Sequence, residues 1–130
     1  MVLQLTPQTT IRELNKSFSA GYPYLKFEFF RKKHGIDEGS AGETIDHATK
    51  LGELNRSMKK GAIQLRAEDA VGDVEQRFYK GFGLSVQVFR KAGETWLETT
   101  KTDRLTLHEQ NEIGKNAGRS FRNNIYTLFL

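Results

Sequence analysis

The sequence predicts an α+β fold: one domain over residues 1–130, built from a β-α-β-β-α unit that occurs twice, over residues 2–60 and 62–115. Two observations lead to this prediction. The two halves of the chain align with each other, and each half alternates between strand-like and helix-like spacing of apolar residues. A length of 130 residues with 37% hydrophobic residues suits a single domain with one core.

The internal alignment covers most of the chain. Residues 2–22 align with residues 62–82 at a constant offset, and the motif FRK recurs after the strand that follows. Residues 41–50 (AGETIDHATK) and 92–101 (AGETWLETTK) are identical at six of ten positions. The first half carries one insertion, KHGIDEGS at residues 33–40. A collinear series of this kind predicts a duplication with the two copies related by a pseudo-twofold axis.

Each repeat begins with a short strand, residues 2–6 and 62–66, in which apolar and polar side chains alternate. A helix follows each strand. Its apolar residues recur every three or four positions, as in an amphipathic helix. The two stripes are Ile11, Leu14 and Phe18 in the first repeat and Val71, Val74 and Phe78 in the second.

The ends of these helices carry recognisable signals. Thr10 and Glu13 form a capping box, in which each side chain accepts a hydrogen bond from the other residue's backbone N–H. In the second repeat we expect Asp69 to be the N-cap. Gly21 and Gly81 stand where left-handed C-caps are expected.

The next strands, residues 25–29 and 84–88, alternate again. The sequence KAGE then turns the chain into a hairpin strand at 95–100, and the first repeat should form the same hairpin around its insertion. Closing helices are predicted over 49–60 and 104–116, the second with a capping box of its own at Thr106 and Glu109. The helices should cover one side of a mixed sheet.

The C-terminal segment, residues 123–130 (NNIYTLFL), is predicted to form one more strand or a tail docked on a partner. As an edge strand it could pair with a second copy, so a homodimer is an open alternative.

Composition excludes several classes of function. The chain has no Cys, and therefore no disulfide, thiolate nucleophile or iron–sulfur cluster. Its N-terminus lacks the features of a secretory signal, and no apolar run reaches the length of a membrane span. We therefore expect a cytoplasmic protein without membrane contact. The net charge of +4 permits an acidic partner without requiring one.

Basic residues at equivalent strand ends are the candidate binding residues. In this position they can contact phosphates or another anionic ligand. The alternative is that they keep the protein soluble and the strand edges unpaired. The expected partner is an unknown protein or an anionic ligand, with nucleic acid less favoured. The candidate residues are Arg31, Lys32, Lys33, His34, Arg90 and Lys91.

Other motifs are weaker. Residues 80–83 (KGFG) match the start of an RNA-recognition signature, but Leu84 and Gln87 stand where its later aromatic residues belong. Residues 33–47 contain six side chains of metal-ligand type without a spacing that implies a geometry. No metal, other cofactor or catalytic residue is therefore predicted. Trp96 is interpreted as either a core residue or an interface anchor.

The stretch FGLSVQVFRKAGETWLETT, followed by the helix with TLHEQN, resembles a small group of uncharacterised bacterial proteins without an assigned activity. The resemblance extends to PYLKFEFFRKKHG in the first repeat and implies a bacterial protein. The second repeat also looks similar to one module of the glyoxalase/bleomycin-resistance superfamily, which pairs two units around a metal. Where that family draws a His from the first strand, this chain has Gln4 and Gln64.

The leading hypothesis for function is a non-catalytic binding or interaction module. It is motivated by a duplication without a convergent set of catalytic residues, and whether the protein is an enzyme is left open. One alternative is a metal-dependent enzyme of the glyoxalase type. Others are a weak nucleic-acid-binding protein that uses the paired basic strand ends, and a self-associating structural protein.

Overall fold

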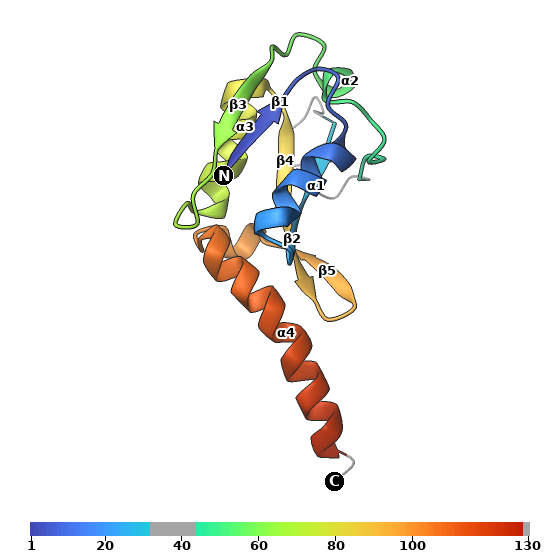
Figure 1. Ribbon diagram of the computed structural model, residues 1–130, viewed down its shortest axis with the longest axis vertical. Coiled ribbons are helices and arrows are strands. Elements are labelled where there is room, and N and C mark those ends of the chain that lie inside the picture. The colour runs from blue at the N-terminus through green and yellow to red at the C-terminus, as the bar shows by residue number, and fades with distance from the viewer. Residues whose placement is uncertain (32–43, 129–130) are drawn as a thin grey trace.

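Within residues 1–31 and 44–128, which the computed structural model describes, five strands form two antiparallel sheets (Figure 1). The α+β class is confirmed. The prediction of one mixed sheet is wrong, because alternation specifies which face of a strand is buried but not which strand lies beside it. The first sheet pairs β1 (Val2–Leu5) with β3 (Gly61–Gln64); the second orders β2 (Leu25–Phe30), β4 (Ser85–Ala92) and β5 (Thr95–Glu98).

Two helices supply most of the helical part of the core, α1 (Ile11–Gly21) and α3 (Val71–Phe82). Both predicted apolar stripes are confirmed, since all six of their residues are buried. Phe27 of β2 lies between the two helices, with its ring centroid 4.0 Å from that of Phe18 and 4.9 Å from that of Phe78. These three rings connect the larger sheet to both helices.

The helix starts differ between the two halves. The capping box of α1 is confirmed: Glu13 N donates to Thr10 Oγ1 at 3.1 Å, and Thr10 N donates to Glu13 Oε1 at 3.0 Å. For α3 the N-cap is Ala70 and not Asp69, and Ala70 supplies no side-chain cap. The Asp69 carboxylate instead accepts hydrogen bonds from Arg66 N and from the Arg77 guanidinium.

The helix ends also correct the prediction. Gly21 and Gly81 are helical and not C-caps: α1 ends at Gly21 with Tyr22 as its C-cap, and α3 continues past Gly81 to Phe82. The residue in the left-handed conformation is Gly83, with a φ of 64°. The hairpin between β4 and β5 is confirmed, and its turn contains Gly93, also at a φ of 64°.

The closing helices differ from each other in length. The first is one turn, α2 (Leu51–Leu54), in place of the expected 49–60. The second, α4 (Leu107–Leu128), follows a short 3-10 turn, η2 (Thr100–Thr102), and begins with the predicted capping box of Thr106 and Glu109. Figure 1 shows α4 running away from both sheets to the C-terminus.

Two further expectations fail. A strand over 123–130 is wrong, because 123–128 continue α4; a short apolar run fits either structure. Residues 129–130 lie outside the described residues. No hairpin strand follows the insertion in the first half, where residues 44–50 contain only an isolated bridge at Lys50. Among the described helices none is long and apolar enough to span a membrane.

The registers of the two sheets share one property. Leu3 of β1 lies directly opposite Ile63 of β3, and Glu28 of β2 lies directly opposite Gln87 of β4. Each of these pairs consists of residues that the internal alignment makes equivalent. Backbone hydrogen bonds before the helices match as well. In the first half, the backbone N–H groups donate as follows: Ile11 to Thr49 O, Arg12 to His47 O, Leu51 to Thr9 O and Gly52 to Pro7 O. In the second half the corresponding bonds are Val71 to Leu105 O, Gly72 to Asp103 O, Leu107 to Asp69 O and His108 to Ala67 O.

Candidate binding surface

The three-stranded sheet has one face in the core and one face directed outward. Its core face carries Phe27 and Phe29 of β2 and Val86 and Val88 of β4, all buried. Because directly opposed residues share a face and successive residues alternate, the register places every second side chain of the three strands together on the other face. This outer face comprises Lys26, Glu28, Phe30, Ser85, Gln87, Phe89, Lys91, Trp96 and Glu98.

A cluster of two lysines and two aromatic rings occupies the outer face near the β4–β5 hairpin. Lys26 Nζ lies 4.7 Å from the centroid of the Trp96 ring and 5.8 Å from that of Phe89. Lys91 Nζ lies 5.1 Å from the Trp96 ring centroid. Both Phe89 and Trp96 are partly exposed. We call these four residues the Lys–Trp cluster; its cation–π contacts hold two ammonium groups beside one indole.

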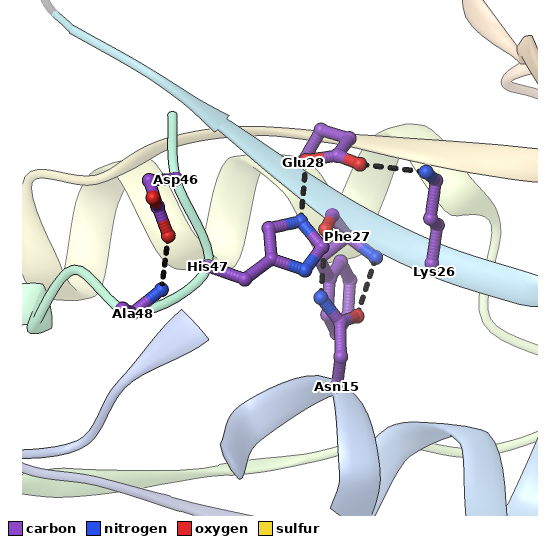
Figure 2. A network of polar contacts seen from close by, with 7 residues as sticks. All are labelled: Asn15, Lys26, Phe27, Glu28, Asp46, His47 and Ala48. Atoms are coloured by element: carbon purple, nitrogen blue, oxygen red, sulfur yellow. Dashed lines mark hydrogen bonds and ion pairs between the residues drawn. The ribbon is translucent and has the colours of Figure 1, made fainter. Parts of the chain in front are cut away.

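Glu28 lies beside this cluster and is almost completely buried, with 4% of its surface exposed. Its two carboxylate oxygens contact different partners: Lys26 Nζ at 2.7 Å and His47 Nε2 at 2.8 Å (Figure 2). A buried carboxylate is tolerated only when it is paired in this way. Glu28 therefore fixes the direction of the Lys26 side chain, and with it one ammonium group of the Lys–Trp cluster.

The loop that carries His47 is itself held in place. Asp46 Oδ1 accepts a hydrogen bond from Ala48 N at 2.8 Å, and His47 O accepts one from Arg12 N at the start of α1 at 2.9 Å. Figure 2 shows this loop next to β2, with the imidazole directed toward Glu28. The segment before α2 thus places the His47 side chain against Glu28 on the outer face.

The outer edge of β2 is covered by Asn15 of α1. Its Oδ1 accepts a hydrogen bond from Phe27 N at 2.8 Å, and its Nδ2 donates to Phe27 O at 2.9 Å (Figure 2). The Asn15 amide therefore hydrogen-bonds to both the N–H and the C=O of Phe27, the groups with which a neighbouring strand would pair.

Glu75 of α3 is a second partly buried carboxyl group and accepts a hydrogen bond from Val88 N at 2.8 Å. Burial, together with the negative charges of Asp103 and Glu98, raises the pKa of Glu75 to about 7. No sequence motif singles out Glu75. Its position four residues after the buried Val71 is the signal that it faces the sheet.

Among the predicted binding residues that the structure describes, Arg31, Arg90 and Lys91 do not share one surface. Arg31 is exposed just beyond the end of β2, whereas Arg90 lies opposite Leu25 at the other end, roughly 20 Å away at the rise of a strand. Arg90 lies on the core-side face, where its Nη1 donates to Gln110 Oε1 at 2.7 Å. Lys91 alone belongs to the outer-face cluster. The others, Lys32, Lys33 and His34, lie outside the described residues.

No three His, Asp or Glu side chains come close enough to hold a metal ion among the residues that the structure describes. Sequence reasoning also missed Lys26, Glu28 and His47 as a connected group. The signal that could have found them is the cross-strand register, which the sequence does not specify. In comparisons with protein-family models, curated proteins and solved structures, no match to this chain was found.

Proposed function

We propose that the chain is a non-catalytic binding module, formed by duplication of one unit, whose Lys–Trp cluster contacts an acidic segment of a partner protein. The observation that supports this function most is the pair of ammonium groups, 4.7 and 5.1 Å from the ring of Trp96. A partly exposed Trp is a frequent anchor of protein interfaces, and the ammonium groups beside it favour carboxylates.

The strand registers support the duplication. An antiparallel pair has a local twofold axis between two directly opposed residues. Leu3 opposite Ile63 and Glu28 opposite Gln87 are equivalent pairs in the alignment, so in each sheet the local twofold axis falls between equivalent positions of the proposed repeats. The matching backbone hydrogen bonds before α1 and α3 agree with this relation.

Trp96 makes the proposal testable without a label, because it is the only Trp in the chain. Titration with a synthetic octaglutamate peptide should change the fluorescence of Trp96, and the change should weaken as salt is added. Lys91→Gln should reduce the affinity about two- to fivefold, in the range of a partly exposed ion pair. Lys16→Gln, on the exposed surface of α1, is the matched control. Equal binding by both variants would refute the assignment of the surface.

A second candidate ligand is single-stranded nucleic acid. The specific observation is that Phe89 and Trp96 are diagonal neighbours on adjacent strands of an outward-facing sheet, an arrangement on which unpaired bases can stack. In the same fluorescence assay, Phe89→Leu should then weaken the binding of oligo(dT) more than it weakens the binding of octaglutamate. Failure of oligo(dT) to alter Trp96 fluorescence at low salt rules this candidate out.

The proposal places the module in a bacterial cytoplasm. A chain without cysteine suits a reducing compartment. Cell fractionation with an antibody to the native protein tests the location, and light scattering tests whether it forms a homodimer. Metal analysis of the purified protein tests the remaining alternative, a metal-dependent enzyme.

A further inference from the structure

The edge of the smaller sheet that is formed by β3 lies next to α3. Met1 and Leu65 exchange both of their backbone hydrogen bonds, at 3.1 and 2.8 Å. Hydrogen-bonded pairs alternate along an antiparallel ladder, so the backbone N–H and C=O groups of Ala62 and Gln64 point away from β1. They point toward α3.

A groove of about 840 Å³ separates this edge from the helix. It is lined by Ala62 and Gln64 on the strand side and by three basic and two acidic side chains, Arg66, Arg77, Lys80, Asp69 and Asp73. Asp69 is already paired with Arg77 at 2.8 Å. The groove therefore has an excess of positive charge, from Arg66 and Lys80 against Asp73.

Gly81 leaves the groove open at the last turn of α3. A Cβ at Gly81 would meet no atom within 4 Å, so the last turn of α3 leaves this space empty. At the equivalent place in the first half, the Met1 side chain lies against Gly21. Gly61 is the alignment partner of Met1, and a Cβ there would meet the ring of Phe82, which lines one end of the groove.

We infer that this groove binds an extended acidic segment of another protein, which adds to β3 as a third strand. Backbone pairing with Ala62 and Gln64 would provide the affinity, and carboxylates facing Arg66 and Lys80 would provide the selectivity. Arg77 Nη1 now holds Gln64 O at 3.0 Å. Its exposed guanidinium can transfer from this carbonyl to a carboxylate of the incoming segment.

The test uses a fluorescein-labelled octapeptide of alternating Glu and Thr, with a Lys/Thr octapeptide as the charge control, in a fluorescence anisotropy titration. The acidic probe should bind and the basic probe should not. Ala62→Pro should weaken binding about tenfold, because it removes one N–H that faces the groove without breaking the ladder to β1. Gln4→Pro is the matched control, because Gln4 lies opposite Ala62 and its N–H faces the other edge of the same sheet.

Equal weakening by both proline variants, or equal binding of both probes, overturns the inference. Because the Lys–Trp cluster can also take up an acidic peptide, these titrations use the Lys91→Gln background. There, Arg66→Glu combined with Lys80→Glu changes only exposed side chains and should abolish binding of the acidic probe even if Ala62→Pro is unstable. Binding that persists in Lys91→Gln alone separates this site from the Lys–Trp cluster. A dimer in light scattering that Ala62→Pro dissociates would instead assign the edge to a second copy and overturn the inference.

Discussion

Glu28 of β2 lies directly opposite Gln87 of β4, and the two residues occupy the same position of the proposed repeats. The same position has nevertheless acquired different roles. Glu28 is a buried carboxyl group in contact with Lys26 and His47, whereas Gln87 has an amide whose Oε1 is buried and has no hydrogen-bond partner among the described residues. The centre of the outer face is thus chemically asymmetric even though its backbone is symmetric.

Glu28→Gln should lower the free energy of unfolding by about 1–3 kcal/mol. The amide has one acceptor oxygen, so it can accept from Lys26 or from His47 but not from both with equal geometry. Urea denaturation measures the loss. Glu94→Gln, in the exposed hairpin turn, is the control and should change stability by less than about 0.5 kcal/mol. Equal effects of the two substitutions would contradict a structural role for the buried carboxylate.

Glu75 should make the protein less stable as the pH rises. Its pKa is about 7 in the folded state, against 4.5 for an ordinary Glu. Between these values the folded state binds more protons than the unfolded state, so the free energy of unfolding decreases with increasing pH. The decrease ends above the folded-state pKa, because both states are then deprotonated.

Glu75→Gln should remove this dependence while its amide oxygen still accepts the hydrogen bond from Val88 N. The difference in unfolding free energy between the variant and the wild type should grow from pH 4.5 to 7 and reach at most about 3 kcal/mol. Urea denaturation over this pH range measures it. If the difference in unfolding free energy stays constant over this pH range, the pKa of Glu75 is not raised in the folded state.

Ala70→Thr should stabilise α3 by about 0.5–2 kcal/mol. Ala70 occupies the N-cap in an extended conformation, with φ −67° and ψ 142°, and offers no side-chain acceptor to the helix. Its equivalent in the first half is Thr10, which provides one. Thr10→Ala should therefore destabilise α1 by a similar amount. Thermal unfolding of the two variants gives the comparison, and a loss of stability in Ala70→Thr would contradict it.

Gly83→Ala and Gly81→Ala should have opposite effects. Gly83 has a positive φ and adjoins the Asn55 amide, which donates to Phe82 O at 2.7 Å, so a methyl group there is strained and crowded. Gly81 is helical with open space around it, and Ala should stabilise the helix by about 0.5–1 kcal/mol. Circular dichroism during thermal unfolding measures both. A stabilised Gly83→Ala would place the end of α3 elsewhere.

Local patterns predicted the parts of the fold that depend on neighbours in sequence. The stripe of Ile11, Leu14 and Phe18 and the capping box at Thr10 require only three- and four-residue spacing. The KAGE hairpin requires only a glycine with positive φ, and Gly93 provides it.

The candidate surface could not be predicted in the same way. Lys26 and Trp96 are far apart in the chain and meet only because β4 lies between their two strands. A period of two assigns each side chain to a face, but the partner strand and its register determine the neighbours on that face. The basic pairs at Arg31 and Arg90 follow the same rule: equivalent positions on antiparallel partners lie at opposite ends of the sheet.

The pairing of strands from different halves of the chain also affects how the chain folds. β1 pairs with β3 and β2 pairs with β4, so each sheet takes strands from both halves. During synthesis, β1 and β2 leave the ribosome long before their partner strands, and the larger sheet cannot form until β4 has been made. Pairings of such sequence separation carry a high entropic cost of loop closure and slow the folding of small domains. The N-terminal half should thus depend on the second half for every strand pairing that the two sheets contain.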